Sequence, residues 1–116
     1  SLQFSVSLML TEAIKHGFGL ADIIRWMSEN PARFLGLDHR KGFLKPGADA
    51  DIVIFDPNEE YTIEPSMILH RNKETPYEKF VVKGKVQATY LRGEEVYRKN
   101  QPFKTATGKS ILRMTL

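Results

Sequence analysis

Three histidines are the first residues to consider for catalysis, because imidazole is the commonest protein ligand for metals. His16, His39 and His70 stand in separate segments, and none belongs to an HxH or HExxH pattern. The absence of cysteine also excludes thiolate metal sites, cysteine nucleophiles and disulfides within this sequence. Solvated or hydrogen-bonded histidines explain the pattern better than a metal centre, so we expect no metal ligand among these residues.

Two carboxylates, Asp49 and Asp51, flank Ala50 immediately before an apolar run. At the spacing of a strand their side chains point to the same side, where they could bind a cation or act as an acid–base pair. The alternative is that they mark the start of a strand and face water.

Residues 107–110 read TGKS, which resembles the end of a phosphate-binding loop. That motif needs a glycine where Phe103 stands, and a strand before it. We therefore predict no phosphate site here. No nucleophile with a base can be assembled elsewhere, so we expect this chain to supply no catalytic residue.

The charges are unevenly distributed along a chain whose net charge is +3. Residues 49–64 contain six acidic residues and no Lys or Arg, whereas residues 70–113 contain eleven Lys or Arg and four Glu. Such a basic excess raises the possibility of nucleic-acid binding. The basic residues lack a regular pattern of stacking aromatics, and Lys or Arg on a hairpin also protects a sheet edge from aggregation. We therefore predict no nucleic-acid partner.

The composition is that of a globular protein, with 41% hydrophobic and 27% charged residues in a chain of 116. The longest apolar runs, such as residues 52–55, fall far short of the roughly 20 residues that a membrane helix needs. Residues 1–10 lack the basic region and cleavage site of a secretory signal. They do not begin with Met and lead straight into a helical pattern, so we expect the chain to be part of a longer protein, called the parent protein below.

The first third of the sequence predicts three helices. Residues 8–14 form the first, which Gly17 ends because glycine readily adopts positive φ. Residues 20–27 form the second, with apolar side chains repeating on one face at Leu20, Ile23, Ile24 and Met27. Asn30 as a cap and Pro31 in the first turn predict the start of a third helix, which ends at Gly36. These apolar faces need a partner surface that the rest of the chain is not helical enough to supply.

From residue 42 the pattern changes to β-structure. Residues 44–47 (LKPG) predict a turn, followed by a strand over residues 50–55 that residues 56–58 end. Residues 61–63 predict a short returning strand, and residues 81–82 the start of another. The clearest unit is a β-hairpin, with residues 86–91 and 94–97 as its arms and Arg92-Gly93 as its turn.

Two long segments resemble the carboxyl-terminal part of the amidohydrolase superfamily. Residues 30–37 read NPARFLGL, and residues 41–56 read KGFLKPGADADIVIFD. In that superfamily this pattern marks the point where the chain leaves a (β/α)8 barrel and enters a small β-sandwich. The resemblance implies an α/β fold made of the last helices of a metallo-hydrolase barrel (residues 1–40), part of a composite β-sandwich (41–99) and an extended tail (100–116). It assigns Asp49 and Asp51 a structural role.

Within the cyclic-amide hydrolases, three further segments are similar to the allantoinases. They are residues 1–3 (SLQ), residues 70–77 (HRNKETPY), and residues 84–93 (GKVQATYLRG) with the VY that follows at 96–97. The resemblance implies a parent protein that hydrolyses the ring amide of allantoin to allantoate, using hydroxide bound to two zinc ions whose ligands all lie outside this chain. It also places Ser1, Leu2 and Gln3 at the rim of the substrate pocket.

The same resemblance implies an intracellular homo-oligomer, with a tetramer as one form, in the cytoplasm or in an organelle such as the peroxisome or mitochondrion. Its only expected ligand is the small-molecule substrate, with no membrane partner. Three alternatives stay open: a dihydropyrimidinase or hydantoinase, a non-catalytic relative of those enzymes that acts as an assembly scaffold, and an independent basic module that binds nucleic acid.

Overall fold

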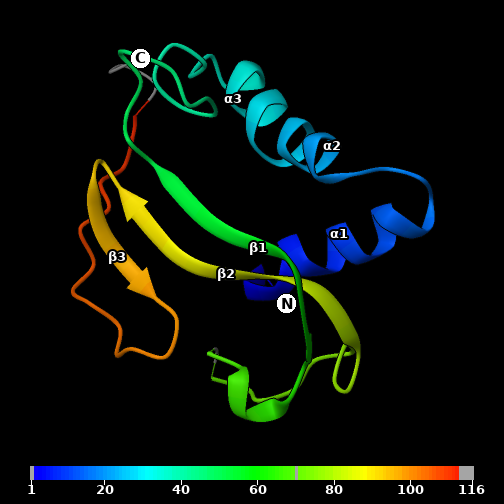
Figure 1. Cartoon of the computed structure of the whole chain (residues 1–116). Helices are drawn as coiled ribbons and strands as arrows, with labels where there is room; N and C mark the ends of the chain where they lie inside the picture. The colour runs from blue at the N-terminus through cyan, green and yellow to red at the C-terminus, as the bar shows by residue number, and fades with distance from the viewer. Residues whose placement is uncertain (1, 70, 113–116) are drawn as a thin grey trace. The chain divides into compact units, whose positions relative to one another are not determined.

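The computed structural model describes residues 2–69 and 71–112, which form two compact units. The first unit contains residues 2–23 and 56–85, and the second contains residues 24–55 and 86–112. The helices are α1 (Ser5–Lys15), α2 (Leu20–Ile24) and α3 (Asn30–Phe34). The strands β1 (Ile52–Thr62), β2 (Val81–Leu91) and β3 (Glu94–Arg98) form a sheet in the order β1-β2-β3 (Figure 1). The predicted succession of helices and then strands is confirmed.

Glycine ends two of the helices, as predicted. Gly17 and Gly36 have φ of 84° and 71°. After α1 the N–H of Phe18 donates to the carbonyl of Ala13 at 2.9 Å, and after α3 the N–H of Leu37 donates to the carbonyl of Ala32 at 2.8 Å. Both are the long hydrogen bond of a Schellman motif, which satisfies a carbonyl that the helix leaves free.

The prediction that Asn30 caps a new helix is wrong. Asn30 has helical φ and ψ of −64° and −43°, and its N–H donates to the carbonyl of Arg25. Residues Arg25–Glu29 thus form a π-helical turn directly before α3. In a regular α-helix a proline ring clashes with the carbonyl four residues earlier. A π-turn before the proline shifts the hydrogen bonds from a spacing of four residues to a spacing of five, which changes the position of that carbonyl. Helical conformation therefore passes through Pro31 instead of restarting there.

A small core holds the first unit together. Phe4, Ile63, Ile68 and Val82 are at most 4% exposed, and Leu8, Tyr61, Met67 and Tyr77 pack against them. Burial of each large aliphatic side chain contributes roughly 1.5–3 kcal/mol. The cluster thus joins Phe4, before α1, to the segment that follows β1 and to the beginning of β2.

Hydroxyl groups of α1 bind the main chain of β2. Ser7 Oγ donates to the carbonyl of Gly84 at 2.6 Å, and the N–H of Lys83 donates to Thr11 Oγ1 at 2.9 Å. Tyr61 in turn donates to Ser7 Oγ at 2.9 Å, so the one buried polar side chain of α1 has two partners. These bonds satisfy strand groups that would otherwise need a neighbouring strand or water.

β1 is longer than the sequence predicted. Residues 56–58 were expected to end the strand and residues 61–63 to begin another, but β1 continues without a break from Ile52 to Thr62. Pro57 removes one N–H donor, which a strand tolerates at the edge of a sheet, and β1 is the outer strand of the described sheet. The residues of a turn signal therefore lie inside a strand.

The predicted hairpin is confirmed. β2 and β3 pair antiparallel, with Leu91 opposite Glu94 and a register shift between Thr89 and Tyr90. Arg92 and Gly93 both have positive φ, 48° and 82°, which is the geometry of the two-residue turn that matches strand twist. β2 begins earlier than predicted, at Val81, and runs through Gly84.

The described part of the tail lies beside β3 in the second unit, although residues 102–112 contain no helix or strand. Figure 1 shows the orange-to-red segment turning back along β3. Lys104 Nζ contacts Glu95 at 2.7 Å, and the rings of Phe103 and Tyr97 are 5.8 Å apart. The described part of the tail is thus held against β3 by side-chain contacts.

Lys79 has a strained backbone conformation. Its φ is 65°, and a side chain in this region of φ costs about 1–2 kcal/mol. The geometry is fixed by the N–H of Lys79, which donates to the carbonyl of Ile63 at 2.7 Å. We expect Lys79→Gly to stabilise the parent protein by up to about 1 kcal/mol, since the entropy lost by glycine offsets part of the relief. Denaturant unfolding checks this. Lys83→Gly in β2, where φ is not positive, is the matched control and should destabilise; equal effects at both positions would contradict the explanation.

Candidate functional site

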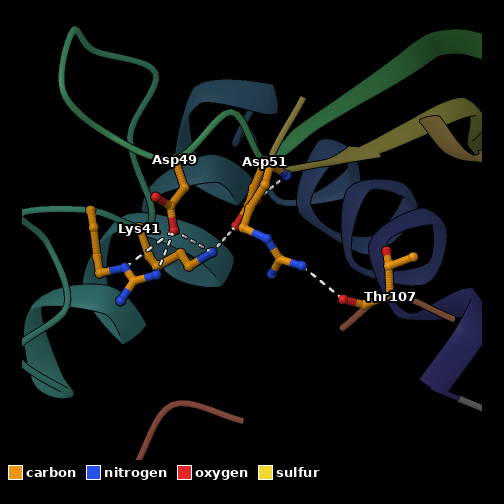
Figure 2. A network of polar contacts seen from close by, with 6 residues as sticks. Lys41, Asp49, Asp51 and Thr107 are labelled. Carbon is orange, nitrogen blue, oxygen red and sulfur yellow. Dashed lines mark hydrogen bonds and ion pairs between the residues drawn. The ribbon is translucent and has the colours of Figure 1, made fainter. Parts of the chain in front are cut away.

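The two carboxylates of the sequence motif converge on one lysine. Lys41 Nζ lies 2.8 Å from Asp49 Oδ2 and also pairs with Asp51 Oδ2 (Figure 2). The guanidinium of Arg40 donates to Asp49 from Nε at 3.1 Å and from Nη2 at 2.9 Å. The side chains of Lys41, Asp49 and Asp51 are 18%, 23% and 31% exposed, so this is a partly buried ion-pair network.

The pKa values of the network are shifted away from neutrality. The hydrogen bond from Lys41, followed by that from Arg40, lowers the pKa of Asp49. Partial burial acts to raise the pKa of Asp51, but the hydrogen bonds from Lys41 and from the N–H of Arg92 lower it overall. The pKa of Lys41 is raised because its bonds to both aspartates outweigh its burial. A general acid or base works best with a pKa near the operating pH, so this network does not suit acid–base catalysis.

The network instead binds the tip of the hairpin. Asp51 Oδ1 accepts the N–H of Arg92, and the carbonyl of Ala50 accepts the N–H of Gly93, both at 2.9 Å. Arg92 Nη2 donates to the carbonyl of Thr107 at 2.7 Å, which adds the tail to the same cluster (Figure 2). Asp49 and Asp51 therefore lie on one side, as predicted, although not through strand geometry: both precede β1, and the N–H of Asp51 donates to the carbonyl of Asp49 at 2.9 Å. Together they hold three chain segments. The interpretation that they simply face water is wrong.

No sequence pattern indicates the partners of these aspartates. Lys41 lies ten residues before Asp51, and Arg92 lies 41 residues after it. Neither separation corresponds to a helix or strand period, so only the folded chain shows the network.

The two histidines that the structure describes belong to different units. His16 follows the end of α1 and His39 lies in the loop after α3, and both are exposed. His70 lies outside the described residues. Within residues 2–69 and 71–112 no group of three or more His, Cys, Asp or Glu side chains is arranged to hold a metal ion. The zinc implied by the resemblance therefore does not fit any side chains described here.

Of the three residues expected at a pocket rim, only Gln3 has a described side chain. Its Nε2 donates to the carbonyl of Met67 at 2.7 Å, and its Oε1 accepts the N–H of Leu69 at 2.8 Å. Both ends of the carboxamide are therefore used to anchor the segment before residue 70. Ser1 and the side chain of Leu2 lie outside the described residues. In the same described part, no helix is long and apolar enough to cross a membrane.

A second charged cluster surrounds Glu95. Arg98 Nη2 and Lys104 Nζ each lie 2.7 Å from a different oxygen of this carboxylate. The hydrogen bond from Arg98, followed by that from Lys104, lowers the pKa of Glu95 from 4.5 to about 2. Both of these cations are bound internally, which reduces the free positive charge on β3 and the tail.

This shift predicts a pH dependence of stability. Because the pKa is lower in the folded state, the charged form of Glu95 stabilises the fold above pH 4.5, and the contribution is lost as the pH falls from 4.5 towards about 2. We expect the Tm of the parent protein to exceed that of its Glu95→Gln variant at pH 6, and the difference to shrink as the pH falls from 4.5 through about 2. Glu60→Gln on β1 is the control variant. A Tm difference that stayed constant with pH would contradict the role of the Glu95 ion pairs. Added salt should reduce the Tm difference at pH 6, because it screens the charges.

The first unit contains a surface groove. It has a volume of about 850 Å³ and lies between α1 and residues 77–82. Its lining is mainly apolar: Leu8, Met9, Tyr77, Phe80, Val81 and Val82. The groove holds no histidine and none of the residues of the two charged clusters.

The sequence profile of the amidohydrolase family matches residues 2–96. The chain belongs to the amidohydrolase family.

Individual relatives narrow this assignment. The chain is 41% identical over 95 residues to the allantoinase of Streptomyces avermitilis, covering 82% of this chain and 21% of the relative, and 40% identical over 109 residues to that of Saccharomyces cerevisiae, covering 93% and 24%. A dihydroorotase of Caldanaerobacter subterraneus is 37% identical over 103 residues, covering 88% and 23%. A solved D-hydantoinase from Bacillus sp. AR9 has a TM-score of 0.78 at 31% identity, covering 85% of this chain and 22% of its own. The chain thus spans about a fifth to a quarter of each relative it matches.

Proposed function

We propose that this chain is the carboxyl-terminal part of an allantoinase, an enzyme that opens the ring of allantoin by hydrolysing a ring amide to give allantoate. The observation that carries the proposal is the 40–41% identity to two allantoinases from distant organisms, over 82–93% of the chain. In this proposal the chain stabilises the enzyme and does not perform the chemistry: Asp49 and Asp51 are ion-paired with Lys41, and the described residues contain no group of three or more His, Cys, Asp or Glu side chains that could hold a metal ion.

The proposal divides the chain as the motifs suggest. Residues 1–40 would be the last helices of the barrel, residues 41–99 part of a composite β-sandwich, and residues 100–116 a tail. The ion-pair network lies at the proposed boundary, where Arg40, the last residue of the first segment, binds Asp49 in the second.

The metal centre and the pocket belong to the same proposal. The parent protein would hold two zinc ions on residues outside this chain, with Ser1, Leu2 and Gln3 at the pocket rim. The two hydrogen bonds of Gln3 give it a role in holding residues 67–69 beside that rim. The proposed parent is an intracellular homo-oligomer, with a tetramer as one form.

Ring opening by the purified parent protein tests this function. Supplied with divalent zinc, it should convert allantoin to allantoate with a kcat/KM at least about 100-fold above that for hydantoin, dihydrouracil or dihydroorotate, since a site built for one polar substrate rejects analogues that leave its buried groups unpaired. A Lys109→Ala variant, altered in an exposed tail residue, should retain full activity.

A hydantoinase or dihydropyrimidinase is the second candidate, favoured by the backbone similarity to D-hydantoinase. A parent protein that cleaves hydantoin or dihydrouracil but not allantoin would support this second candidate. A folded parent protein that opens none of the four rings would instead indicate a non-catalytic relative.

A further inference from the structure

Residues 102–111 follow β3 back along the hairpin without forming a helix or a strand (Figure 1). They belong to the same unit as β3, so their contacts with the hairpin lie within one compact body. Because none of these residues is paired in the sheet, their attachment to the hairpin depends on contacts made by side chains.

Phe103 and Lys104 make the first two of these contacts. The ring of Phe103 lies 5.8 Å from that of Tyr97, and Lys104 Nζ lies 2.7 Å from Glu95 Oε1. Lys104 is 45% exposed, and an ion pair so open to water shifts an equilibrium by no more than about five-fold. Arg98 also lies 2.7 Å from Glu95, so the carboxylate keeps a cation when Lys104 leaves it.

Arg92 makes the third contact, from the turn of the hairpin. Its Nη2 donates to the carbonyl of Thr107 at 2.7 Å. The turn does not depend on this bond, because the N–H of Arg92 donates to Asp51 and the N–H of Gly93 donates to Ala50, both at 2.9 Å. The guanidinium can therefore exchange the Thr107 carbonyl for water while the turn keeps its shape.

The hydroxyl of Thr107 opposes this attachment. Thr107 Oγ1 is buried and has no hydrogen-bond partner among the residues that the structure describes. Burial of such a hydroxyl is unfavourable, because it would regain hydrogen bonds to water if the segment opened. One group thus favours the open state, whereas the polar groups that favour the closed state can each find water or a second partner when their contacts break.

We propose that residues 102–111 form a detachable strap, destabilised by the hydroxyl of Thr107, which leaves β3 as one unit while the hairpin and the ion pairs of Lys41 stay intact. Segments held by few buried contacts open locally at much lower cost than the whole fold. Salt should promote the opening, since it screens the exposed ion pair between Lys104 and Glu95. The inference concerns residues of this chain alone and does not depend on the substrate of the parent protein.

Trypsin cleavage of the folded parent protein tests the strap, because a protease cuts a folded segment through its opened state. The readout is the cut after Lys109, an exposed residue that takes part in none of the three contacts. We expect Glu95→Gln and Phe103→Ala each to speed this cut by about two- to ten-fold. Glu94→Gln, on the same strand, is the matched control and should leave it unchanged. Acceleration confined to the cut after Lys104 would show piecemeal fraying and would overturn the proposal.

Salt dependence is the second readout. Raising sodium chloride from about 0.05 M to about 1 M should speed the cut after Lys109 by about two- to five-fold in the parent protein but not in Glu95→Gln, after correction with a short peptide substrate. Equal acceleration of the cuts after Lys83 and Lys85 in β2 would show that the hairpin opens as well, which overturns the proposal. A cleavage rate constant that falls as the concentration of the parent protein rises would place residues 102–111 on a second copy, with the same consequence.

Thr107→Val tests the opposing hydroxyl. The substitution keeps the shape of the side chain and the carbonyl that Arg92 binds, so it should slow the cut after Lys109 by at least about five-fold. Thr105→Val, at an exposed residue of the same segment, is the control and should have little effect. An equal or faster cut in Thr107→Val would show that the hydroxyl does not favour opening, which contradicts the proposal.

Discussion

Replacing Gly42 with alanine is expected to destabilise the parent protein by about 2–5 kcal/mol, through two independent effects. Gly42 has φ of 84°, where any side chain costs about 1–2 kcal/mol. A methyl group added there would lie 2.5 Å from Cβ of Ala32 and 2.9 Å from the carbonyl oxygen of Ser28. Such overpacking costs a further 1–3 kcal/mol or so, because a helix backbone cannot move aside easily. Urea unfolding of the parent protein and of its Gly42→Ala variant measures the sum of the backbone and packing costs.

Gly47 is the matched control for this prediction. Its φ is 88°, nearly that of Gly42, but an added methyl group would meet nothing within 4 Å. Gly47→Ala should therefore show only the backbone cost of about 1–2 kcal/mol. In an Ala32→Gly background the difference between the two alanine variants should shrink, since one of the clashing atoms is gone. If Gly42→Ala costs no more than Gly47→Ala, the close approach of the loop to the helix is wrong.

Features set by neighbouring residues were predictable. The helix ends at Gly17 and Gly36 depend on one residue that readily adopts positive φ, and the hairpin depends on a two-residue turn between β-favouring arms. The Pro46-Gly47 turn is confirmed for the same reason, with the N–H of Ala48 donating to the carbonyl of Lys45.

Features that depend on tertiary context could not be predicted from the sequence. A local signal at residues 56–58 favours a turn, but pairing in the sheet keeps these residues in β1. Asn30 favours a cap, but the π-turn before it lets the helical conformation pass. In each case a local preference worth about 1 kcal/mol is outweighed by the pairing or packing of the whole element.

The candidate site shows the same division. The spacing of Asp49 and Asp51 predicted that they share a side, which the convergence on Lys41 confirms. Their partners come from loops up to 41 residues away, for which the sequence has no periodic signal. The family assignment came from the resemblance of residues 30–56, not from chemistry that the residues could be seen to perform.

The isolated 116-residue chain is expected to melt without the cooperative transition of a domain. Sixteen large hydrophobic side chains are at least 36% exposed in the described structure, including Phe34 at 90% and Leu44 at 76%. Of the apolar stripe predicted on the second helix, Ile23 is buried, but Leu20 and Ile24 are 37% and 46% exposed. Apolar side chains left in water add nothing to stability, and a chain of this size has little to spare.

Calorimetry of the isolated chain and of the parent protein checks this expectation. The parent should show one sharp transition that includes these residues, whereas the isolated chain should show a broad one and bind a hydrophobic dye at neutral pH. A sharp transition of the isolated chain, with equal calorimetric and van't Hoff enthalpies, would mean that its small core and ion-pair network suffice. Since only seven hydrophobic side chains are buried among the described residues of the first unit, we expect instead that docking onto the rest of the parent supplies the missing burial.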